Sequence, residues 1–194
     1  EVAPVTVNTR KGETTVERDE QPLKADIEKI RKLKPAFDTD GTVTAANSSS
    51  ISDGASALVL MRRSEAEKRG LTPLATIVAH ATHSHEPAWF TTAPIGAIEK
   101  VLGKAGWTLG NVGLFEINEA FAVQTLVCAR GLGLSDEQLN PRGGAIALGH
   151  PIGASGARIL TTLIYAMENK KAKTGLATLC IGGGEASALI VEKV

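Results

Sequence analysis

Two glycine-rich stretches stand out in the C-terminal third of the chain, GHPIGASGAR at residues 149–158 and CIGGG at residues 180–184. The first runs into the start of a predicted helix at Ser155, and the second follows an apolar run typical of a strand. Another apolar run follows residue 185, so the chain is predicted to form a hairpin that turns through residues 182–185. Each stretch therefore lies at the end of a regular element, where glycines let another group approach closely.

Strand and helix patterns alternate over residues 52–194, outward from these stretches. The predicted strands are residues 57–61, 74–79, 114–117, 176–181 and 186–191. The predicted helices are residues 64–70, 95–102, 118–130 and a helix from Ser155, with Ser64 and Asn118 as N-caps. The short apolar run at residues 145–148 is left without an assignment. This alternation predicts an α/β fold with a mixed five-stranded sheet covered by helices on both faces.

Residues 1–51 have a different character, because they are polar, charged and irregular. A strand is predicted at residues 2–7 and a helix at residues 23–33, and residues 41–52 have the composition of a loop. We therefore expect two parts, residues 1–51 and residues 52–194.

Composition excludes several classes of protein. The formal net charge is +0 with both signs interspersed, which argues against a nucleic-acid groove or an anionic membrane surface. No apolar run reaches the roughly 20 residues of a membrane span. The 2 cysteines are too few for a secreted disulfide scaffold, so we expect reduced thiols and a cytoplasmic protein.

His150 and Cys180 are the main candidates for chemistry. A lone histidine is more often structural, but His150 lies in a glycine-rich turn beside the free N–H groups of a helix start, where it can exchange protons near neutral pH. Cys180 could be a small buried hydrophobe, yet the glycines after it expose backbone N–H groups that suit an oxyanion hole. Cys128 lies in the middle of a predicted helix and is interpreted as structural.

Two further groups of polar residues could bind a ligand or a metal ion. Asn118 follows a predicted strand, where open α/β sheets bind their ligands, so its amide could hold a water or an oxygen besides capping a helix. His80, His83 and His85 are spaced as His-x-x-His-x-His, but no thiol or acidic partner other than Glu86 is near in the sequence. We expect a surface turn there and no metal site.

The chain resembles the C-terminal half of a thiolase. The resemblance rests on motifs in the family's order and spacing: PAFD at 35–38, TVTAAN at 42–47, SDGA at 52–55, NEAF at 118–121, GGAIALGHP at 143–151 and the loop after Cys180. It implies that residues 1–51 are the end of the loop domain that covers coenzyme A and that residues 52–194 are the C-terminal thiolase domain. The acyl-carrying cysteine of the family belongs to an N-terminal half that these residues do not include.

The activity that the resemblance implies is that of an acetyl-CoA C-acetyltransferase, which condenses two acetyl-CoA molecules or thiolyses acetoacetyl-CoA. His150 would activate the nucleophilic cysteine and Asn118 would hold a water in the first oxyanion hole. Cys180 would shuttle protons, and the Gly182 N–H would contribute to the second oxyanion hole. Ser49 would meet the pantetheine arm and Phe90 would lie beside the acyl group.

The resemblance also implies partners. Acetyl-CoA, acetoacetyl-CoA or other 3-ketoacyl-CoA thioesters would be substrates, with no tightly bound cofactor, in a pathway of fatty acid metabolism. The partners would be the N-terminal half and further copies in a dimer or tetramer. Two alternatives stay open: a noncatalytic acyl-CoA-binding or assembly module, and a cysteine hydrolase that uses Cys180 and His150.

Overall fold

The computed structural model describes residues 2–194 and is built around a mixed four-stranded sheet. The strands are β3 (Ala75–Ser84), β4 (Leu114–Ile117), β5 (Thr174–Ile181) and β6 (Glu185–Lys193), in the order β3-β6-β5-β4. β4 and β5 are parallel, whereas β6 is antiparallel to both β5 and β3. The predicted α/β class, the mixed sheet and the terminal hairpin are confirmed, but the sheet has four strands in place of the predicted five.

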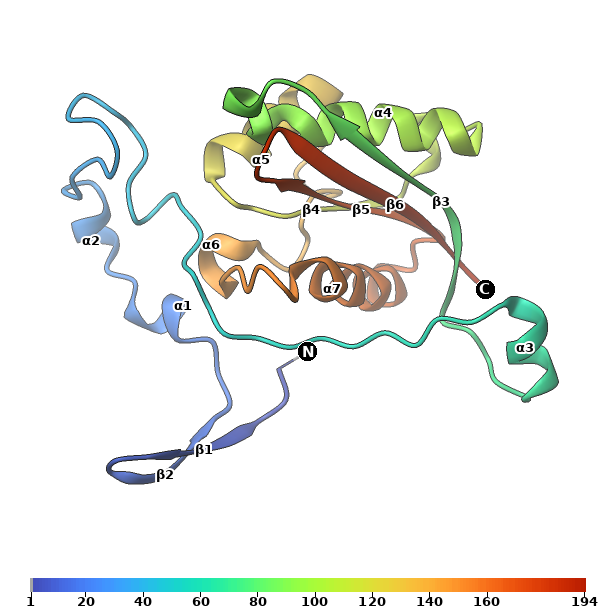
Figure 1. Ribbon diagram of the computed structural model, residues 1–194, viewed down its shortest axis with the longest axis horizontal. Coiled ribbons are helices and arrows are strands. Elements are labelled where there is room, and N and C mark those ends of the chain that lie inside the picture. Colours follow the sequence, from blue (N-terminus) through green and yellow to red (C-terminus); the bar gives the residue numbers. More distant parts are fainter. Residues whose placement is uncertain (1) are drawn as a thin grey trace.

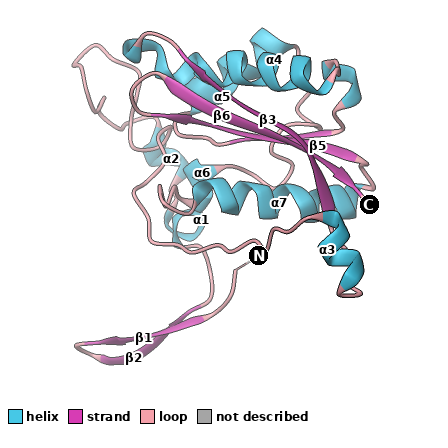
Figure 2. Cartoon of the chain, turned by 45° about the vertical axis from the view of Figure 1, so that its right-hand side comes forward, coloured by secondary structure: helices cyan, strands magenta, loops and turns pink. Residues whose placement is uncertain are grey.

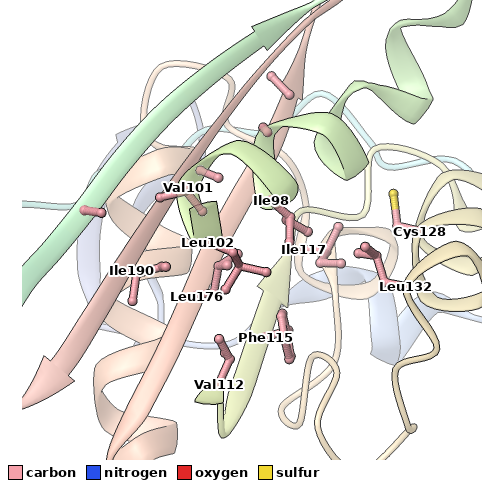
Figure 3. Close-up of a cluster of buried hydrophobic side chains, with 14 of the residues drawn as sticks. Ile98, Val101, Leu102, Val112, Phe115, Ile117, Cys128, Leu132, Leu176 and Ile190 are labelled. Atoms are coloured by element: carbon pink, nitrogen blue, oxygen red, sulfur yellow. The ribbon is translucent and has the colours of Figure 1, made fainter. Parts of the chain in front are cut away.

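Helices cover both faces of this sheet (Figure 1 and Figure 2). On one face, α4 (Ala93–Ala105) and α5 (Ala122–Leu132) pack against β4 and β6 and form the larger core, which Figure 3 shows around Ile98, Phe115 and Ile117. On the other face, α7 (Ser155–Lys170) packs against β4 and β5 through Ile159 and Leu163. Burial of these apolar side chains is the main stabilising contribution to the domain.

The segment at residues 57–61 is extended, as predicted, but it is not a strand of this sheet. Figure 1 shows it running along α7, on the side away from the sheet. Within residues 2–194, no backbone–backbone hydrogen bond involves residues 53–61, and Val59 is 88% exposed. A continuous apolar run is typical of a buried strand, but pairing also requires a free sheet edge. The outer edge of β4 is instead met by an isolated bridge between Phe115 and Leu139.

The N-terminal part projects away from the sheet (Figure 2). The predicted strand at residues 2–7 is found as β1 (Val5–Thr9), which pairs with β2 (Gly12–Val16), a strand that the sequence analysis did not anticipate. The single helix predicted at residues 23–33 is wrong. Two short helices, α1 (Glu20–Lys24) and α2 (Ile27–Ile30), are separated by Ala25 in an extended conformation.

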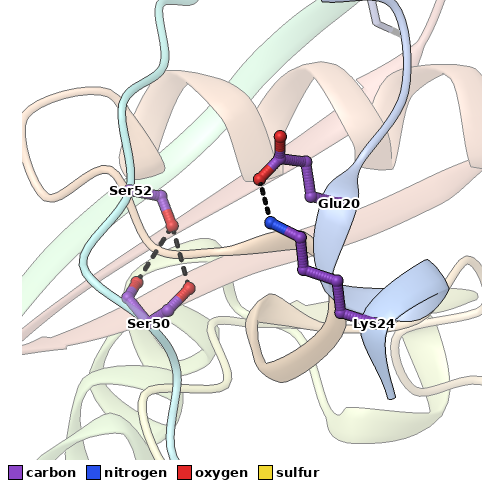
Figure 4. Close-up of polar contacts among 4 residues, drawn as sticks. All are labelled: Glu20, Lys24, Ser50 and Ser52. Carbon is purple, nitrogen blue, oxygen red and sulfur yellow. Dashed lines mark hydrogen bonds and ion pairs between the residues drawn. The ribbon is translucent and has the colours of Figure 1, made fainter.

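Polar contacts fix this break between α1 and α2. Lys24 forms an ion pair with Glu20 at 2.6 Å within α1 (Figure 4). The Asp26 side chain accepts a hydrogen bond from the Glu28 N–H and so caps α2 as a separate helix. The helical spacing of apolar residues continues across Asp26 and so predicted one helix. Asp26 instead caps a second helix, so the prediction was wrong at this point.

Helix starts were predicted with mixed success. α7 begins at Ser155 as expected. Ser64, however, does not cap α3 (Arg63–Lys68), whose N-cap is Arg62, and Asn118 does not cap α5, whose N-cap is Phe121. Residues 145–148, which were left unassigned, form the short helix α6 (Ala145–Leu148). The remaining elements are the 3₁₀ helices η1 (Pro87–Thr92) and η2 (Leu109–Asn111). Among the described helices, none combines the length and apolar character needed to cross a bilayer.

Candidate active site at the ends of strands β4 and β5

Asn118 and Cys180 meet at one edge of the sheet because β4 and β5 are parallel and end on the same side. Asn118 directly follows β4, and its N–H donates to the Thr178 carbonyl at 2.9 Å, which extends the ladder by one residue. Cys180 lies two residues further along β5. The Asn118 side chain is buried, and its Oδ1 has no hydrogen-bond partner among the described residues. This edge is where open α/β sheets bind ligands.

His150 is brought to the same edge by the glycine-rich loop between α6 and α7. Its N–H donates to the Ser50 carbonyl at 3.1 Å, so the loop lies beside the segment at residues 50–52. A Cβ at Gly149, whose φ is +89°, would overlap the Ser52 side chain. That hydroxyl is fixed by hydrogen bonds to Ser50 (Figure 4). Glycine is therefore needed at position 149 both for its backbone conformation and for the close approach.

The tautomer of His150 follows from its two neighbours. The Ser155 hydroxyl donates its one proton to the Pro151 carbonyl at 3.0 Å, and the same Oγ lies 2.5 Å from His150 Nδ1. Asn118 Nδ2 can only donate, so Nε2 of the neutral imidazole accepts from it and Nδ1 carries the proton beside Ser155. Nε2 is left as the acceptor, 3.3 Å from Asn118 Nδ2. The basic nitrogen of His150 therefore faces Asn118.

The protonation states of His150 and Cys180 are both set mainly by burial. Burial, with a smaller contribution from the Arg158 charge, lowers the pKa of His150, so the imidazole is neutral near pH 7. Burial also raises the pKa of the Cys180 thiol, although a backbone hydrogen bond opposes this shift. The site thus contains a neutral base and a neutral thiol. Cys128 lies in the core on α5, where burial and the neighbouring Cys180 raise its pKa to about 12.

The loop after β5 presents bare backbone. Apart from Gly182 and its chain neighbours, no atom of the described residues lies within 4 Å of a Cβ built on Gly182, and this residue is exposed. A ligand can therefore approach the backbone at this residue. Gly184 is the opposite case, because it is buried with a φ of +90° and a Cβ there would overlap the His85 carbonyl. This contact attaches the loop to the end of β3.

Ser49 and Phe90 reach this end of the sheet from other elements. Ser49 is half-buried, and its N–H donates to the Ala120 carbonyl at 3.0 Å, two residues after Asn118. Phe90 is half-buried on η1, which packs against both β5 and β6. Of the predicted residues, His150 and Asn118 are joined by a hydrogen bond between their side chains. The other predicted residues lie on elements that reach the same edge of the sheet, at the ends of β4 and β5: Cys180, Gly182, Ser49 and Phe90.

Three residues with a clear local role were missed by the sequence analysis. Ser155 was assigned only as a helix start, although its hydroxyl orients His150. Glu119 accepts a hydrogen bond from the Ile146 N–H at 3.0 Å and so holds α6 near the end of β4. His85 lies against the glycine loop. Only the contact between Ser155 and His150 has a signal in the sequence, which is a serine at a helix start five residues after a histidine.

The histidine-rich segment is a strand and not the expected surface turn. His80 and His83 both lie within β3, and the rings of His83 and His85 meet edge-to-face with centroids 5.3 Å apart. In the part of the chain that the structure describes, no group of three or more histidine, cysteine, aspartate or glutamate side chains is arranged to hold a metal ion.

These features define a class of α/β protein in which a neutral histidine, a buried amide and a buried thiol meet at the carboxyl ends of parallel strands. The C-terminal domain model of thiolases matches residues 71–193, and the N-terminal domain model matches residues 1–64. The chain belongs to the thiolase family.

Individual relatives agree with this assignment. The chain is 50% identical, over 194 residues, to the acetyl-CoA acetyltransferase of Paracoccus denitrificans, with all of the chain and 50% of the relative covered. The crystal structure of the Bacillus anthracis acetyl-CoA acetyltransferase superposes with a TM-score of 0.94 at 43% identity, over 99% of this chain and 49% of that one. Human mitochondrial 3-ketoacyl-CoA thiolase in complex with CoA gives a TM-score of 0.85 at 36% identity, over 97% and 48%. The chain therefore spans about half the length of these relatives.

Proposed function

We propose that this chain is the C-terminal half of an acetyl-CoA C-acetyltransferase, which condenses two acetyl-CoA molecules or thiolyses acetoacetyl-CoA. It would supply His150, Asn118, Cys180 and Gly182, and an N-terminal half would supply the nucleophilic cysteine. The observation that carries this proposal is the contact of Asn118 with the basic Nε2 of His150, whose Nδ1 lies beside Ser155. The substrates would be coenzyme A thioesters, and no tightly bound cofactor is required.

In the first half-reaction, His150 Nε2 takes the proton from the thiol of the nucleophilic cysteine. The lowered pKa keeps Nε2 unprotonated near pH 7, so it is ready to accept this proton. Once protonated, the same N–H can donate to the thioester oxygen as charge develops there. Asn118 would contribute to the same oxyanion hole through a bound water. Its buried Oδ1 lacks a partner among the described residues and is a suitable acceptor for this water.

Cys180 links the two half-reactions, because it gives a proton to the coenzyme A that leaves in the first and takes a proton from the acyl-CoA that reacts in the second. The raised pKa keeps its sulfur protonated, so it can protonate the departing coenzyme A thiolate. The resulting Cys180 thiolate is a strong base because burial disfavours its charge, and it then removes an α-proton from the second acyl-CoA. The resulting carbanion attacks the carbonyl of the acyl-cysteine, the carbon–sulfur bond breaks, and the leaving cysteine thiolate takes back the proton held by His150. The backbone N–H of Gly182 would stabilise the oxyanion that forms at this carbonyl.

The unpaired segment at residues 53–61 supports the proposal of an N-terminal half as partner. It lies within the 1–64 match to the N-terminal domain model, while the C-terminal domain model begins at residue 71. Within the described chain its backbone forms no backbone–backbone hydrogen bond, and the segment borders an apolar groove of about 680 Å³ against α7 and the start of β3. We propose that residues 53–61 pair with a sheet of the N-terminal half, because an unpaired apolar strand is a template for another strand.

Residues 1–51 are proposed to cover coenzyme A, with Ser49 beside the pantetheine arm and Phe90 beside the acyl group, and residues 52–194 to form the C-terminal domain. Further copies would complete a dimer or tetramer. Ser49 is a reasonable contact because its backbone is tied to the segment that follows Asn118. A noncatalytic acyl-CoA-binding module would have no need for the oriented imidazole of His150, so catalysis is the stronger proposal.

The test uses a chimera in which the N-terminal half of the Paracoccus denitrificans relative precedes this chain. We expect the chimera to consume acetoacetyl-CoA, measured by its absorbance, and the chain alone to be inactive because it lacks the acyl-carrying nucleophile. Turnover by the chain alone, or an inactive but folded chimera, would contradict the proposal.

Two variants of the chimera separate the assigned roles. His150→Ala should slow the transfer of radiolabelled acetyl to the protein, whereas Cys180→Ala should permit slow acetylation and block exchange of the acetyl-CoA methyl hydrogens with deuterated water. Each loss should be at least about 10²–10⁴-fold, as is typical when a general acid or base is removed. Normal hydrogen exchange in Cys180→Ala would refute the role given to this thiol.

A further inference from the structure

The side chain of His85 joins the glycine loop to the 3₁₀ helix η1. β3 ends at Ser84, opposite Glu185 at the start of β6, so His85 follows directly beside the loop 182–184. The His85 N–H donates to the Gly184 carbonyl at 2.9 Å. The His85 carbonyl occupies the space that a Cβ on Gly184 would need. The backbone of His85 is thus held against the loop that presents the Gly182 N–H.

The imidazole of His85 reaches in the other direction. Its Nε2 lies 2.7 Å from the Trp89 carbonyl oxygen. Because a carbonyl oxygen can only accept, Nε2 carries a proton and donates it. The Thr92 hydroxyl donates to the same oxygen at 2.9 Å. Two donors therefore converge on one backbone carbonyl of η1.

This carbonyl belongs to a bend in η1. Trp89 has non-helical backbone angles, with φ of −104° and ψ of 18°, inside the run Pro87–Thr92. A carbonyl at such a bend is poorly served by helical hydrogen bonds and needs other donors. His85 and Thr92 supply them, so they hold the backbone at the bend. The next residue is Phe90.

His85 is supported from behind by His83. The His83 ring contacts the His85 ring edge-to-face at 5.3 Å between centroids. It also lies so close to α4 that a Cβ on Gly96 would be 2.6 Å from the ring. The His85 ring is therefore held in place by a side chain that is itself packed between β3 and α4.

We propose that His85 is a positioning residue that sets the distance between Phe90 and the side of the site formed by Cys180 and Gly182, and so limits the length of the acyl group. This rests on the proposed function, because it takes Phe90 and Gly182 as parts of that site. The argument is geometric: one residue bonds the catalytic loop through its main chain and the Phe90 helix through its side chain. Loss of the imidazole would free η1 without touching Cys180, His150 or Asn118.

The experiment compares His85→Ala, His85→Gln and Thr92→Val with His80→Ala as the matched control. The exposed side chain of His80 comes from the same strand and contacts neither the loop nor η1 through a hydrogen bond that the structure describes. In the chain alone, hydrogen exchange of residues 87–92 should become about two- to tenfold faster in His85→Ala, the factor that corresponds to one lost hydrogen bond. His85→Gln should restore slow exchange because its amide can donate to the Trp89 carbonyl, and Thr92→Val should give an intermediate rate.

In the chimera, the readout is the ratio of kcat/KM for acetoacetyl-CoA to that for a 3-ketoacyl-CoA with a longer chain. His85→Ala should shift this ratio toward the longer substrate, and His85→Gln and His80→Ala should retain it. An unchanged ratio in His85→Ala with an active parent, or a shifted ratio that His85→Gln does not rescue, would overturn the inference. An inactive parent chimera would contradict the proposed function alone, and hydrogen exchange of the chain would still decide whether His85 holds η1.

Discussion

Gly184 and His85 show how closely two backbones approach beside the candidate site. The His85 carbonyl lies where a side chain at position 184 would begin, and the φ of +90° at Gly184 is one that other residues rarely adopt. The glycines after Cys180 therefore have different roles. Gly182 leaves space for a ligand, while Gly184 leaves space for β3.

Gly184→Ala should destabilise the fold, because the new methyl group would overlap the His85 carbonyl in a strained backbone conformation. We expect a loss of about 1–3 kcal/mol in the free energy of unfolding, measured by urea denaturation. Gly103→Ala is the matched control: it lies in α4, nothing is within 4 Å of its Cβ, and it should stabilise by up to about 1 kcal/mol. Equal effects of the two substitutions would refute this explanation.

His83 and His150 should make the stability fall when the pH drops from neutral. Burial is the main cause that lowers the pKa of each, so the folded state resists protonation. The unfolded chain takes up protons below a pKa of about 6.5, so stability is fully present above that pH and is lost as the pH falls toward the lowered values. The urea midpoint should therefore be lower at pH 5.5 than at pH 7.5.

The comparison of variants assigns this pH dependence. His83→Gln should show a smaller difference between the two midpoints than the parent, whereas His80→Gln, in an exposed position of the same strand, should keep the parent's difference. Glu20 and Glu137, whose pKa values are lowered, lose stabilisation only in a more acidic range. An undiminished difference in His83→Gln would show that this imidazole is not responsible.

The sequence predicts the kinds of residue in the candidate site, but it does not predict the contacts among them. His150, Asn118 and Cys180 were selected because glycines or a strand end stand next to each of them. The Ser155 hydroxyl that lies beside His150 Nδ1 could not be identified in this way, because it depends on how the loop folds back on the helix. Asn118 was expected to be an N-cap, yet α5 begins only at Ala122. The side-chain amide of Asn118 faces His150 instead.

At the scale of elements, the segment at residues 53–61 has an apolar sequence typical of a buried strand, but its side chains at Val59 and Leu60 are exposed. Leu60 is 65% exposed and Val59 is 88% exposed. Neither residue forms a backbone–backbone hydrogen bond within the described chain. The continuous apolar run predicts a strand, because such residues favour a sheet, but the segment pairs with no strand in the described chain. The run could not indicate which sheet would receive the segment, because strand pairing is a long-range property.

Val59→Pro tests the proposed pairing. The Val59 N–H makes no hydrogen bond in the described chain and the backbone is extended, so proline should change the thermal midpoint of the chain alone very little. In a sheet, however, proline removes a ladder hydrogen bond and is not tolerated in a central strand. Binding of a separately produced N-terminal half, measured by size-exclusion chromatography, should be lost in Val59→Pro and retained in Val59→Thr. Retained binding in the proline variant would contradict pairing through this segment.

At the scale of the whole molecule, many large apolar side chains of the described chain are exposed, and several of them are neighbours. α7 contributes little to this apolar surface, because Ile159, Leu163 and Met167 are buried against the sheet. On α5, in contrast, Val123, Leu126 and Val127 are all at least 39% exposed and share one face. Together with the unpaired segment, they form two apolar areas on opposite sides of the sheet.

Self-association of the chain alone is the expected consequence, because large exposed apolar patches favour contact between copies. Light scattering should give a mass that increases with protein concentration and falls when an N-terminal half is added. Lysine at positions 59 and 60 or at positions 123 and 126 should reduce association from the corresponding surface. A mass that stays monomeric at high concentration would refute the prediction.

The unpaired segment also has a consequence for the order of synthesis. In a polypeptide that carries both halves, residues 53–61 leave the ribosome after the whole N-terminal half and after the part proposed to cover coenzyme A. Domains commonly fold during translation, the N-terminal one first, at about 5–20 residues added per second. Here the sheet of the first half would stay one strand short for several seconds, with an open edge. The two halves would therefore have to fold in overlapping time, and a chaperone would have its greatest effect in that interval.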